Sequence, residues 1–497
     1  MANNSKHEVW LTRIAVAVDV ADRNNDSILL YSAIRRCRAL SLLAPDDVAL
    51  QLNYFISNCW SAIERIRALE MGRYEWYQEG HVEQVFYLRS IINSPSFIKL
   101  SKIRRNQVIT NYGNIMNTLG RFMTALDAWN QAISSSPDFA AALGSRGFGL
   151  ICLAKHLPDV RHKLKIAAMA RQDLKSAISS AAFWDSGQEI ESKLIIMSHL
   201  EYVNNFIDSE KETETKLNEI ESQDDYMSWC EEKSLLIDAL NFPGSNISLK
   251  YDHLHLPPHR YESGDGALKF VNYFNQLKSS FAYTRRILYE GDMRIGYDHN
   301  PKNIYDSGDN AIYGSVIENY KSTIRDAYSI FDKISLFVND YFSINEKPSS
   351  VNFRKIWYDK MKEKNGLRAE FSESRNWPLK GLFYLSKDLF DKQFVGIADP
   401  DGETIDKIRN QIEHRYLAVT QVRESVLRDD AIMYINIADL RDYAFQIMQK
   451  AREAIVLLSL SVHAEEYKRK CDSSKDGIEF VTIKQIALPA PAVPKAW

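Results

Sequence analysis

The chain has 497 residues, of which 45% are hydrophobic and 26% are charged. This composition is typical of globular proteins and excludes general disorder, and the length allows about two to four domains with separate cores. The net charge of −3 excludes a generally basic molecule, so any nucleic-acid surface must be a local patch.

The five cysteines are scattered along the chain and include no C-x-x-C pair. Their spacing predicts neither a disulfide framework nor a zinc site, which fits a reducing compartment. The N-terminus contains no apolar stretch like that of a signal peptide, and the most apolar run, 454–462, is about half as long as a membrane span. We therefore expect a cytoplasmic protein.

Helical periodicity dominates the sequence. Glycine and proline are sparse, at 20 and 14 residues, and apolar residues recur at steps of three and four almost everywhere. This pattern predicts stacked amphipathic helices. Strand-like alternation is hard to find beyond the short segment 480–483, so we expect an all-α fold without a large sheet.

A helical repeat is clearest at residues 110–137, where small and large residues follow the order of a tetratricopeptide unit. Small residues stand where two helices meet, aromatic residues fill the space between them, and a proline ends the second helix. These residues are Gly113, Met116, Gly120, Phe122, Ala125, Trp129, Ala132 and Pro137. The sequence therefore predicts a tetratricopeptide-like α-solenoid in this part of the chain.

A second unit follows Pro137, because Gly147 and Leu150 repeat the spacing of Gly113 and Met116. Its second helix is displaced by an insertion around residues 156–162, and its candidate contacts are Ala170, Leu174 and Ala177. We expect residues 50–103 to contain degenerate helix pairs of the same kind.

Two segments separate these repeats from the C-terminal half. The run 208–225 is densely acidic, which indicates a solvated helix face or a linker. Residues 241–265 are rich in proline and glycine and predict a long connection. We therefore expect a repeat domain at 1–240, a connection at 241–265, a helical bundle at 266–472 and a tail at 473–497.

Long helices are predicted again in the C-terminal half. One apolar stripe runs over residues 313–341, and another runs over 440–462. Asn436 and Asp439 resemble an N-terminal capping box for the latter helix. A third helix is expected from about residue 404 to 422.

The segment 405–419 carries the most informative polar residues. Its apolar stripe consists of Ile405, Ile408, Ile412, Tyr416 and Val419. At roughly 100° per residue, Asn410 and His414 lie about 140° and 180° from the start of this stripe, so they point away from the core. Arg409 lies near the edge of the stripe, from which a long side chain can curl toward His414.

Arg409-Asn410-x-x-x-His414 resembles the R-N-x-x-x-H motif of the HEPN superfamily, whose helical-bundle members include many bacterial RNases. The longer string IRNQIEHRYL resembles a bacterial branch in which HEPN follows an N-terminal repeat region, and the segment 376–388 resembles that branch less specifically. The resemblance covers roughly residues 265–470 and implies a HEPN-like helical bundle.

In that family two protomers pack so that their motifs face each other, which implies a homodimer through the C-terminal bundle. The resemblance implies that His414 is the acid or base, that Arg409 binds the scissile phosphate and that Asn410 positions either. The neighbouring residues Glu413, Arg415 and Tyr416 are weaker candidates for substrate binding.

This set of residues suits the cleavage of RNA. The nucleophile is the 2′-OH of RNA itself, so the protein needs only a base, an acid and a cation for the developing charge. The sequence contains no H-E-x-x-H or P-loop pattern, and we expect neither a metal ion nor a cofactor.

We therefore expect a metal-independent endoribonuclease of bacterial toxin or antiphage-defence type, with repeats that sense, regulate or bind a protein or ligand partner. Two alternatives stay open. The first is a catalytically inactive HEPN module for dimerisation and binding, with the repeats as a scaffold for protein partners. The second is a HEPN-assisted partner of a separate nucleotidyltransferase.

Two other patterns are expected to have no such role. Arg294 and His299 share the R-x4-H spacing but lack the asparagine of the motif. His253, His255 and His259 have a spacing that a metal ion could use, but they stand in a proline-rich loop without a cysteine.

Overall fold

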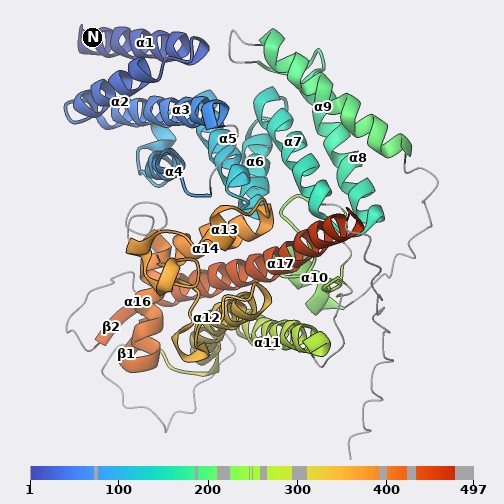
Figure 1. The fold of residues 1–497 in the computed structure, drawn as a ribbon. Helices are drawn as coiled ribbons and strands as arrows, with labels where there is room; N and C mark the ends of the chain where they lie inside the picture. The colour runs from blue at the N-terminus through green and yellow to red at the C-terminus, as the bar shows by residue number, and fades with distance from the viewer. Residues whose placement is uncertain are drawn as a thin grey trace, which may run out of the picture.

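The computed structural model describes residues 2–71, 76–184, 189–209, 224–245, 247–248, 250–257, 266–293, 311–390, 400–421 and 432–475. Within these residues, helices make up almost all regular structure, and the sheet consists of two short strands (Figure 1). The all-α fold class is confirmed. No helix in the described part of the chain is long and apolar enough to span a membrane.

The N-terminal part is an arc of helices that pack one after another (Figure 1). Most neighbours in this arc are joined by short connections, so each helix packs beside the next. The helices are α1 (Ala2–Arg23), α2 (Ser27–Ser41), α3 (Asp46–Met71), α4 (Glu79–Ile92), α5 (Lys102–Thr118), α6 (Phe122–Ser135), α7 (Ala140–His156), α8 (Val160–Ala177) and α9 (Glu189–Ser209), with a 3-10 turn η1 (Phe97–Lys99) before α5.

The small residues of the predicted repeats lie where the helices cross. A Cβ atom added at Gly113 would come within 2.5 Å of Trp129 Nε1, and one at Gly147 would come within 2.8 Å of Leu174. Each glycine therefore allows the close approach of the two helices in its pair. The expected insertion lengthens α7, which ends nine residues after Gly147, whereas α5 ends five residues after Gly113. The assignment of these pairs to the tetratricopeptide family remains a prediction.

The C-terminal part is built around one long helix, α17 (Ile437–Lys475). Its residues 454–462 are all buried, which explains why this run is apolar on every side. The surrounding elements are α10 (Asp225–Glu232), α11 (Gly266–Met293), α12 (Ser315–Tyr341), η3 (Pro348–Ser350), η4 (Asp359–Met361), η5 (Glu363–Asn365), α13 (Ala369–Ser372), α14 (Trp377–Phe390), α16 (Pro400–His414), β1 (Tyr416–Thr420) and β2 (Ile432–Asn436). Helices α13 and α14 lie on the side of α17 toward the N-terminal arc, and α11 and α12 lie on the other side (Figure 1).

The helix expected over residues 404–422 is wrong in its second half. Helix α16 ends at His414, and the following residues form β1, which pairs in parallel with β2 from Tyr416↔Ile432 to Thr420↔Asn436. Tyr416 and Val419 continue the helical spacing of the apolar stripe by coincidence. Val419 is buried, but Tyr416 is 73% exposed and does not belong to the apolar face of α16.

The described residues just before and within the expected connection pack against α17. Arg452 of α17 donates hydrogen bonds to the carbonyl oxygens of Leu236, Asp238 and Asn241, and Ser459 donates one to the carbonyl of His255. This segment is therefore held to the bundle. The acidic residues 210–223, the strand-like segment 480–483 and residues 476–497 of the tail lie outside the described residues.

Candidate functional site at the end of helix α16

One face of α16 anchors the helix to the bundle. Ile408 is fully buried, Gln411 is 9% exposed, and Ile412 packs partly buried against the core. The backbone N–H of Arg415 donates to the Gln411 carbonyl oxygen at 3.0 Å, so the helical hydrogen bonding reaches just past His414. The anchored face fixes the direction in which the opposite face points.

The motif residues lie where the sequence places them. Asn410 and His414 are exposed, and the His414 side chain is 72% exposed. Arg409 lies at the edge, with its side chain 27% exposed and its guanidinium 4.8 Å above the ring of Tyr328 in α12. The predicted outward direction of Asn410 and His414 is confirmed.

A carboxylate stands between the arginine and the histidine. Glu413 Oε1 is 3.3 Å from Arg409 Nε, and Glu413 Oε2 is 3.7 Å from His414 Nε2. The first contact is a weak i,i+4 pair, and the second is longer than a hydrogen bond. Glu413 therefore lies next to both Arg409 and His414. The curl of Arg409 toward His414 stays a prediction.

Helix α12 contributes two residues to this region that the motif did not indicate. The ring of Tyr328 packs against the Arg409 guanidinium, and Asp332 lies close enough to interact electrostatically with Arg409. Burial raises the pKa of Asp332, and Arg409 opposes this rise. Both residues stand in the segment 313–341, where the apolar periodicity predicted a helix but no contact with Arg409.

Two of the weaker candidates, Arg415 and Tyr416, lie beyond the end of α16. Arg415 and Tyr416 are exposed at the turn into β1, next to His414 in the chain. The structure thus brings Arg409, Glu413 and His414 into contact range within one chain, and it leaves Arg415 and Tyr416 on the open surface beside them.

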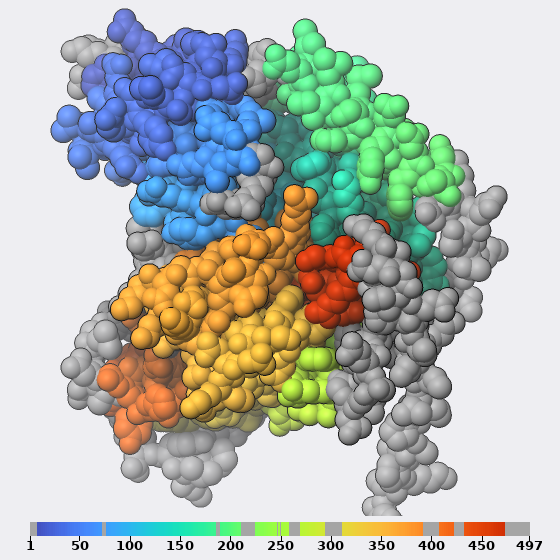
Figure 2. Space-filling view, viewed as in Figure 1, coloured from blue at the N-terminus to red at the C-terminus, as the bar shows by residue number. Residues whose placement is uncertain are grey.

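The segment 376–388 forms the junction between the two parts of the molecule. Trp377 Nε1 donates to the Asn117 carbonyl oxygen at 2.8 Å, and Tyr384 donates to the Trp76 carbonyl oxygen at 2.7 Å. A Cβ atom at Gly120 would lie 2.4 Å from the Trp377 carbonyl oxygen, so the turn between α5 and α6 touches α14 backbone to backbone. Figure 2 shows the blue N-terminal helices resting directly on the orange residues of this region.

A buried ion network completes this junction. Asp388 of α14 accepts two hydrogen bonds from Arg89 at 3.0 Å each and also contacts Arg121, which binds Glu453 of α17 through two contacts of 2.9 Å. All four side chains are at most 6% exposed. Burial raises the pKa of the Asp388 carboxyl, but the two guanidinium groups outweigh this effect and hold the pKa below its usual value.

The histidine-rich loop forms contacts within the protein. His253 Nδ1 lies 3.4 Å from Asp238 Oδ1, and His463 of α17 contacts the His255 carbonyl oxygen at 3.1 Å. Within the described residues, no group of three or more histidine, cysteine or carboxylate side chains could hold a metal ion. His259 and the pair Arg294 and His299 lie outside the described residues.

The bundle of α11 to α17, with an R-N-x-x-x-H motif on the outward face of α16, has the architecture expected of a HEPN domain. Residues 261–465 match the family model described as LA2681-like HEPN. This part of the chain is therefore a HEPN domain of the LA2681-like kind, and the predicted membership of the HEPN superfamily is confirmed. No curated protein and no solved structure matches the chain.

Proposed function

We propose that this protein is an endoribonuclease whose active site is formed by Arg409, Asn410 and His414. The observation that supports this proposal is the arrangement at the end of α16. A histidine and an amide are presented to solvent by a helix whose opposite face is buried, and an arginine held beside them is 27% exposed. Polar side chains that do not serve the core are available for a substrate.

The chemistry follows from these side chains. His414 takes the proton of the ribose 2′-OH, the 2′ oxygen attacks the adjacent phosphorus, and the 5′ oxygen leaves after receiving a proton from an acid. Arg409 binds the phosphate and stabilises the negative charge of the transition state. Asn410 positions the phosphate or His414 by hydrogen bonds. The products are a 2′,3′-cyclic phosphate and a 5′-hydroxyl end.

A second protomer would complete the site. One chain presents a single histidine on an open surface, whereas the reaction needs both a base and an acid and benefits from the exclusion of water. Two copies that pair through this surface bring two histidines and two arginines together. We therefore propose a homodimer in which the two α16 helix ends face each other.

We also propose that the repeats control or target the cleavage, as in a bacterial toxin or antiphage-defence protein. The concave side of a helical arc offers a large surface for a protein or ligand partner. The buried junction at α14 and α17 would carry a change at the repeats to the HEPN domain, because it connects the two parts directly.

The test uses the full-length protein, total RNA and an excess of EDTA. We expect cleavage by the wild type, products with 2′,3′-cyclic phosphate ends, and loss of cleavage in His414→Ala. His299→Ala is the matched control, because it removes a histidine with the same spacing from an arginine. If the wild type and His414→Ala cleave RNA equally, on varied RNAs and with the cognate trigger, the proposed endoribonuclease activity is contradicted.

A mixing experiment tests whether the site is shared. His414→Ala and Arg409→Ala protomers are mixed after each is shown to be inactive. A shared site would have one intact histidine and one intact arginine from different chains in the mixed dimer, so activity should return in part. A site contained in one chain would stay inactive in every mixture, and light scattering would show whether dimers form at all.

One observation favours the alternative function, a HEPN module for dimerisation and binding. The Glu413 carboxylate lies between Arg409 and His414 and would repel a phosphate at this position. In that case the exposed end of α16 binds a protein surface, and the repeats serve as a scaffold. An inactive wild type that still forms dimers through α16 would support this function.

A further inference from the structure

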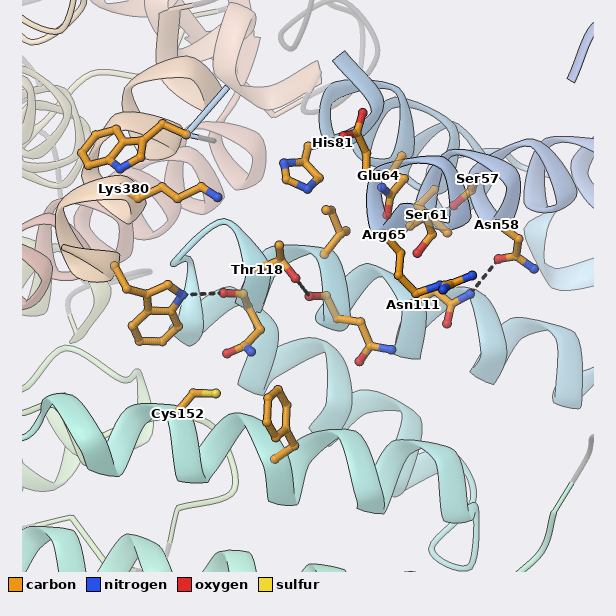
Figure 3. A pocket seen from close by; sticks show the side chains of 18 of the residues that line it. Ser57, Asn58, Ser61, Glu64, Arg65, His81, Asn111, Thr118, Cys152 and Lys380 are labelled. Atoms are coloured by element: carbon orange, nitrogen blue, oxygen red, sulfur yellow. Dashed lines mark hydrogen bonds between the residues drawn. The ribbon is translucent and has the colours of Figure 1, made fainter. Parts of the chain in front are cut away.

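A cavity of about 610 Å³ lies where the repeats meet the HEPN domain (Figure 3). Its lining comes from α3, α4, α5 and α7 on one side and from residues 374–380 at the start of α14 on the other. A volume of this size suits a small-molecule ligand. The cavity is separate from the motif on α16, because none of its lining residues belongs to α16.

Lys380 is the unusual residue of this cavity. It is 7% exposed, and its ammonium group points into the space between the helices (Figure 3). Among the described residues no carboxylate forms an ion pair with it, and its ammonium nitrogen lies over the ring of Tyr384, 5.9 Å from the ring centroid. Burial lowers the pKa of Lys380 to about 8.

A second lysine of the same helix shows what the ordinary arrangement is. Lys387 is 5% exposed, and its ammonium group lies 3.4 Å from Glu363 Oε1. Buried charges are normally paired in this way, because an unpaired charge loses its hydration without compensation. Lys380 also stands in the first turn of α14, where the helix dipole disfavours a cation. Its position is therefore unfavourable unless an anion binds next to it.

The other charged groups of the cavity do not supply that anion. Glu64 accepts hydrogen bonds from Arg67 and from the backbone N–H of Gly80, both at 2.9 Å. Burial and the charges of Lys380 and Arg67 lower the pKa of His81 to about 3, so this imidazole is neutral. The cavity thus has an excess of positive charge that an anionic ligand would neutralise.

The remaining lining provides hydrogen bonds and an aromatic surface. Asn58, Asn111 and Asn114 contribute amides. Asn111 donates to Asn58 Oδ1 at 3.0 Å, and Asn114 Oδ1 accepts from Trp129 at 3.1 Å. The Asn58 and Asn114 amide N–H groups can therefore meet the acceptors on the edge of a nucleobase.

Phe148 is 41% exposed on the cavity wall; one face of its ring stacks on His199 with the centroids 4.8 Å apart, and a base can stack on the other face. The lysine can bind a phosphate, the amides can bind the edge of a base, and the exposed ring can stack on the face of a base.

We infer that this cavity binds a nucleotide, with the phosphate at Lys380 and the base among the asparagine side chains and Phe148. The ligand would contact both the repeats and the HEPN domain, and it would strengthen their packing when bound. This inference does not depend on RNA cleavage at α16.

The test is isothermal titration calorimetry of the full-length protein with AMP, GMP, CMP and UMP, and with the corresponding nucleosides and inorganic phosphate. We expect at least one nucleotide to bind at least tenfold more tightly than its nucleoside and than phosphate alone. Lys380→Met should weaken that binding at least tenfold, whereas the matched variant Lys387→Met should bind as the wild type does. Lys380→Gln is the second variant, since it keeps a polar end without the charge.

The same titration with Arg409→Ala distinguishes this cavity from the surface of α16, because binding in the cavity should persist when Arg409 is removed. Three results would overturn the inference: no binding of any nucleotide, equal binding by the wild type and Lys380→Met, or binding of inorganic phosphate as tightly as of any nucleotide. The last result would mean that the cavity holds an anion but does not recognise a base.

Discussion

The end of α16 and the junction at α14 both contain arginine next to carboxylate, but in opposite surroundings. At α16, Arg409 and Glu413 are partly exposed and belong to the same helix. At the junction, Arg121 contacts Asp388 and Glu453 with all three side chains at most 6% exposed. An exposed pair contributes little to stability, whereas the loss of one partner from a buried network leaves an uncompensated charge.

This difference separates residues that serve function from residues that hold the fold. Residues at the end of α16 can change with little effect on folding, so their arrangement is free to serve a substrate or a partner. Residues of the ion network cannot change singly without a large cost. Lys380 belongs to neither group, since it is buried like the network but has no carboxylate partner within the part of the chain that the structure describes. This exception is the reason to place a ligand beside it.

The largest expected effect is on catalysis at the exposed site. His414→Ala should reduce the rate of RNA cleavage by about 10³-fold or more, because general acid–base catalysis contributes on the order of 10²–10⁴ and the histidine occurs twice in the dimer. The free energy of unfolding should change by less than about 0.5 kcal/mol, because the side chain is 72% exposed. Single-turnover cleavage and urea unfolding measure the two quantities.

The next effect is on stability at the buried junction. Asp388→Ala should lower the free energy of unfolding by about 3–5 kcal/mol, because Arg89 and Arg121 are left buried without their shared carboxylate. Asp22→Ala is the control, since it removes the partner of Arg65 from an exposed pair and should cost less than about 1 kcal/mol. Equal losses in the two variants would mean that the junction is not a closed, dry interface.

The third effect has the opposite sign. Lys380→Met should stabilise the ligand-free protein at pH 7, by at most about 3 kcal/mol, since a fall of the lysine pKa from 10.5 to about 8 corresponds to roughly this free energy. The folded state binds the proton less tightly than the unfolded state, so the penalty is complete below pH 8 and disappears between pH 8 and about 10.5.

The stability of the wild type should therefore approach that of Lys380→Met as the pH rises through this range. The other charged groups that line the cavity, Glu64, Arg65 and Arg375, are the same in both proteins. His81, whose pKa is about 3, is neutral throughout this pH range. Thermal unfolding at several pH values measures the difference in stability between the two proteins. A difference that does not change between pH 7 and 10 would mean that Lys380 has a partner in solution.

The smallest effect concerns Glu413. Glu413→Gln should change the free energy of unfolding by no more than about 0.5 kcal/mol, because it removes only an i,i+4 pair on a helix surface. The affinity for RNA should rise several-fold, since a negative charge next to the proposed phosphate site is lost. Binding of a 2′-deoxy substrate analogue measures this change without cleavage. A fall in affinity would mean that Glu413 is needed to position Arg409.

Features that depend on neighbours in the chain were predictable from the sequence. Helix positions follow from apolar periodicity, the contacts of Gly113 with Trp129 and Gly147 with Leu174 follow from repeat spacing, and the outward direction of His414 follows from the geometry of one helix. The HEPN membership of residues 261–465 was also visible in the motif and its context. Each of these features depends on residues that are close to one another in the sequence.

Features that depend on distant partners required the tertiary structure. The strand β1 ends the helical stripe at His414 because residues 416–420 pair with residues 432–436, a choice that local spacing could not reveal. The ion network joins residues that are 267 to 332 positions apart, such as Arg89 with Asp388 at a separation of 299. Lys380 and Lys387 stand on the same helix and look alike in the sequence, and only the packing around α14 gives one of them a carboxylate and leaves the other facing a cavity.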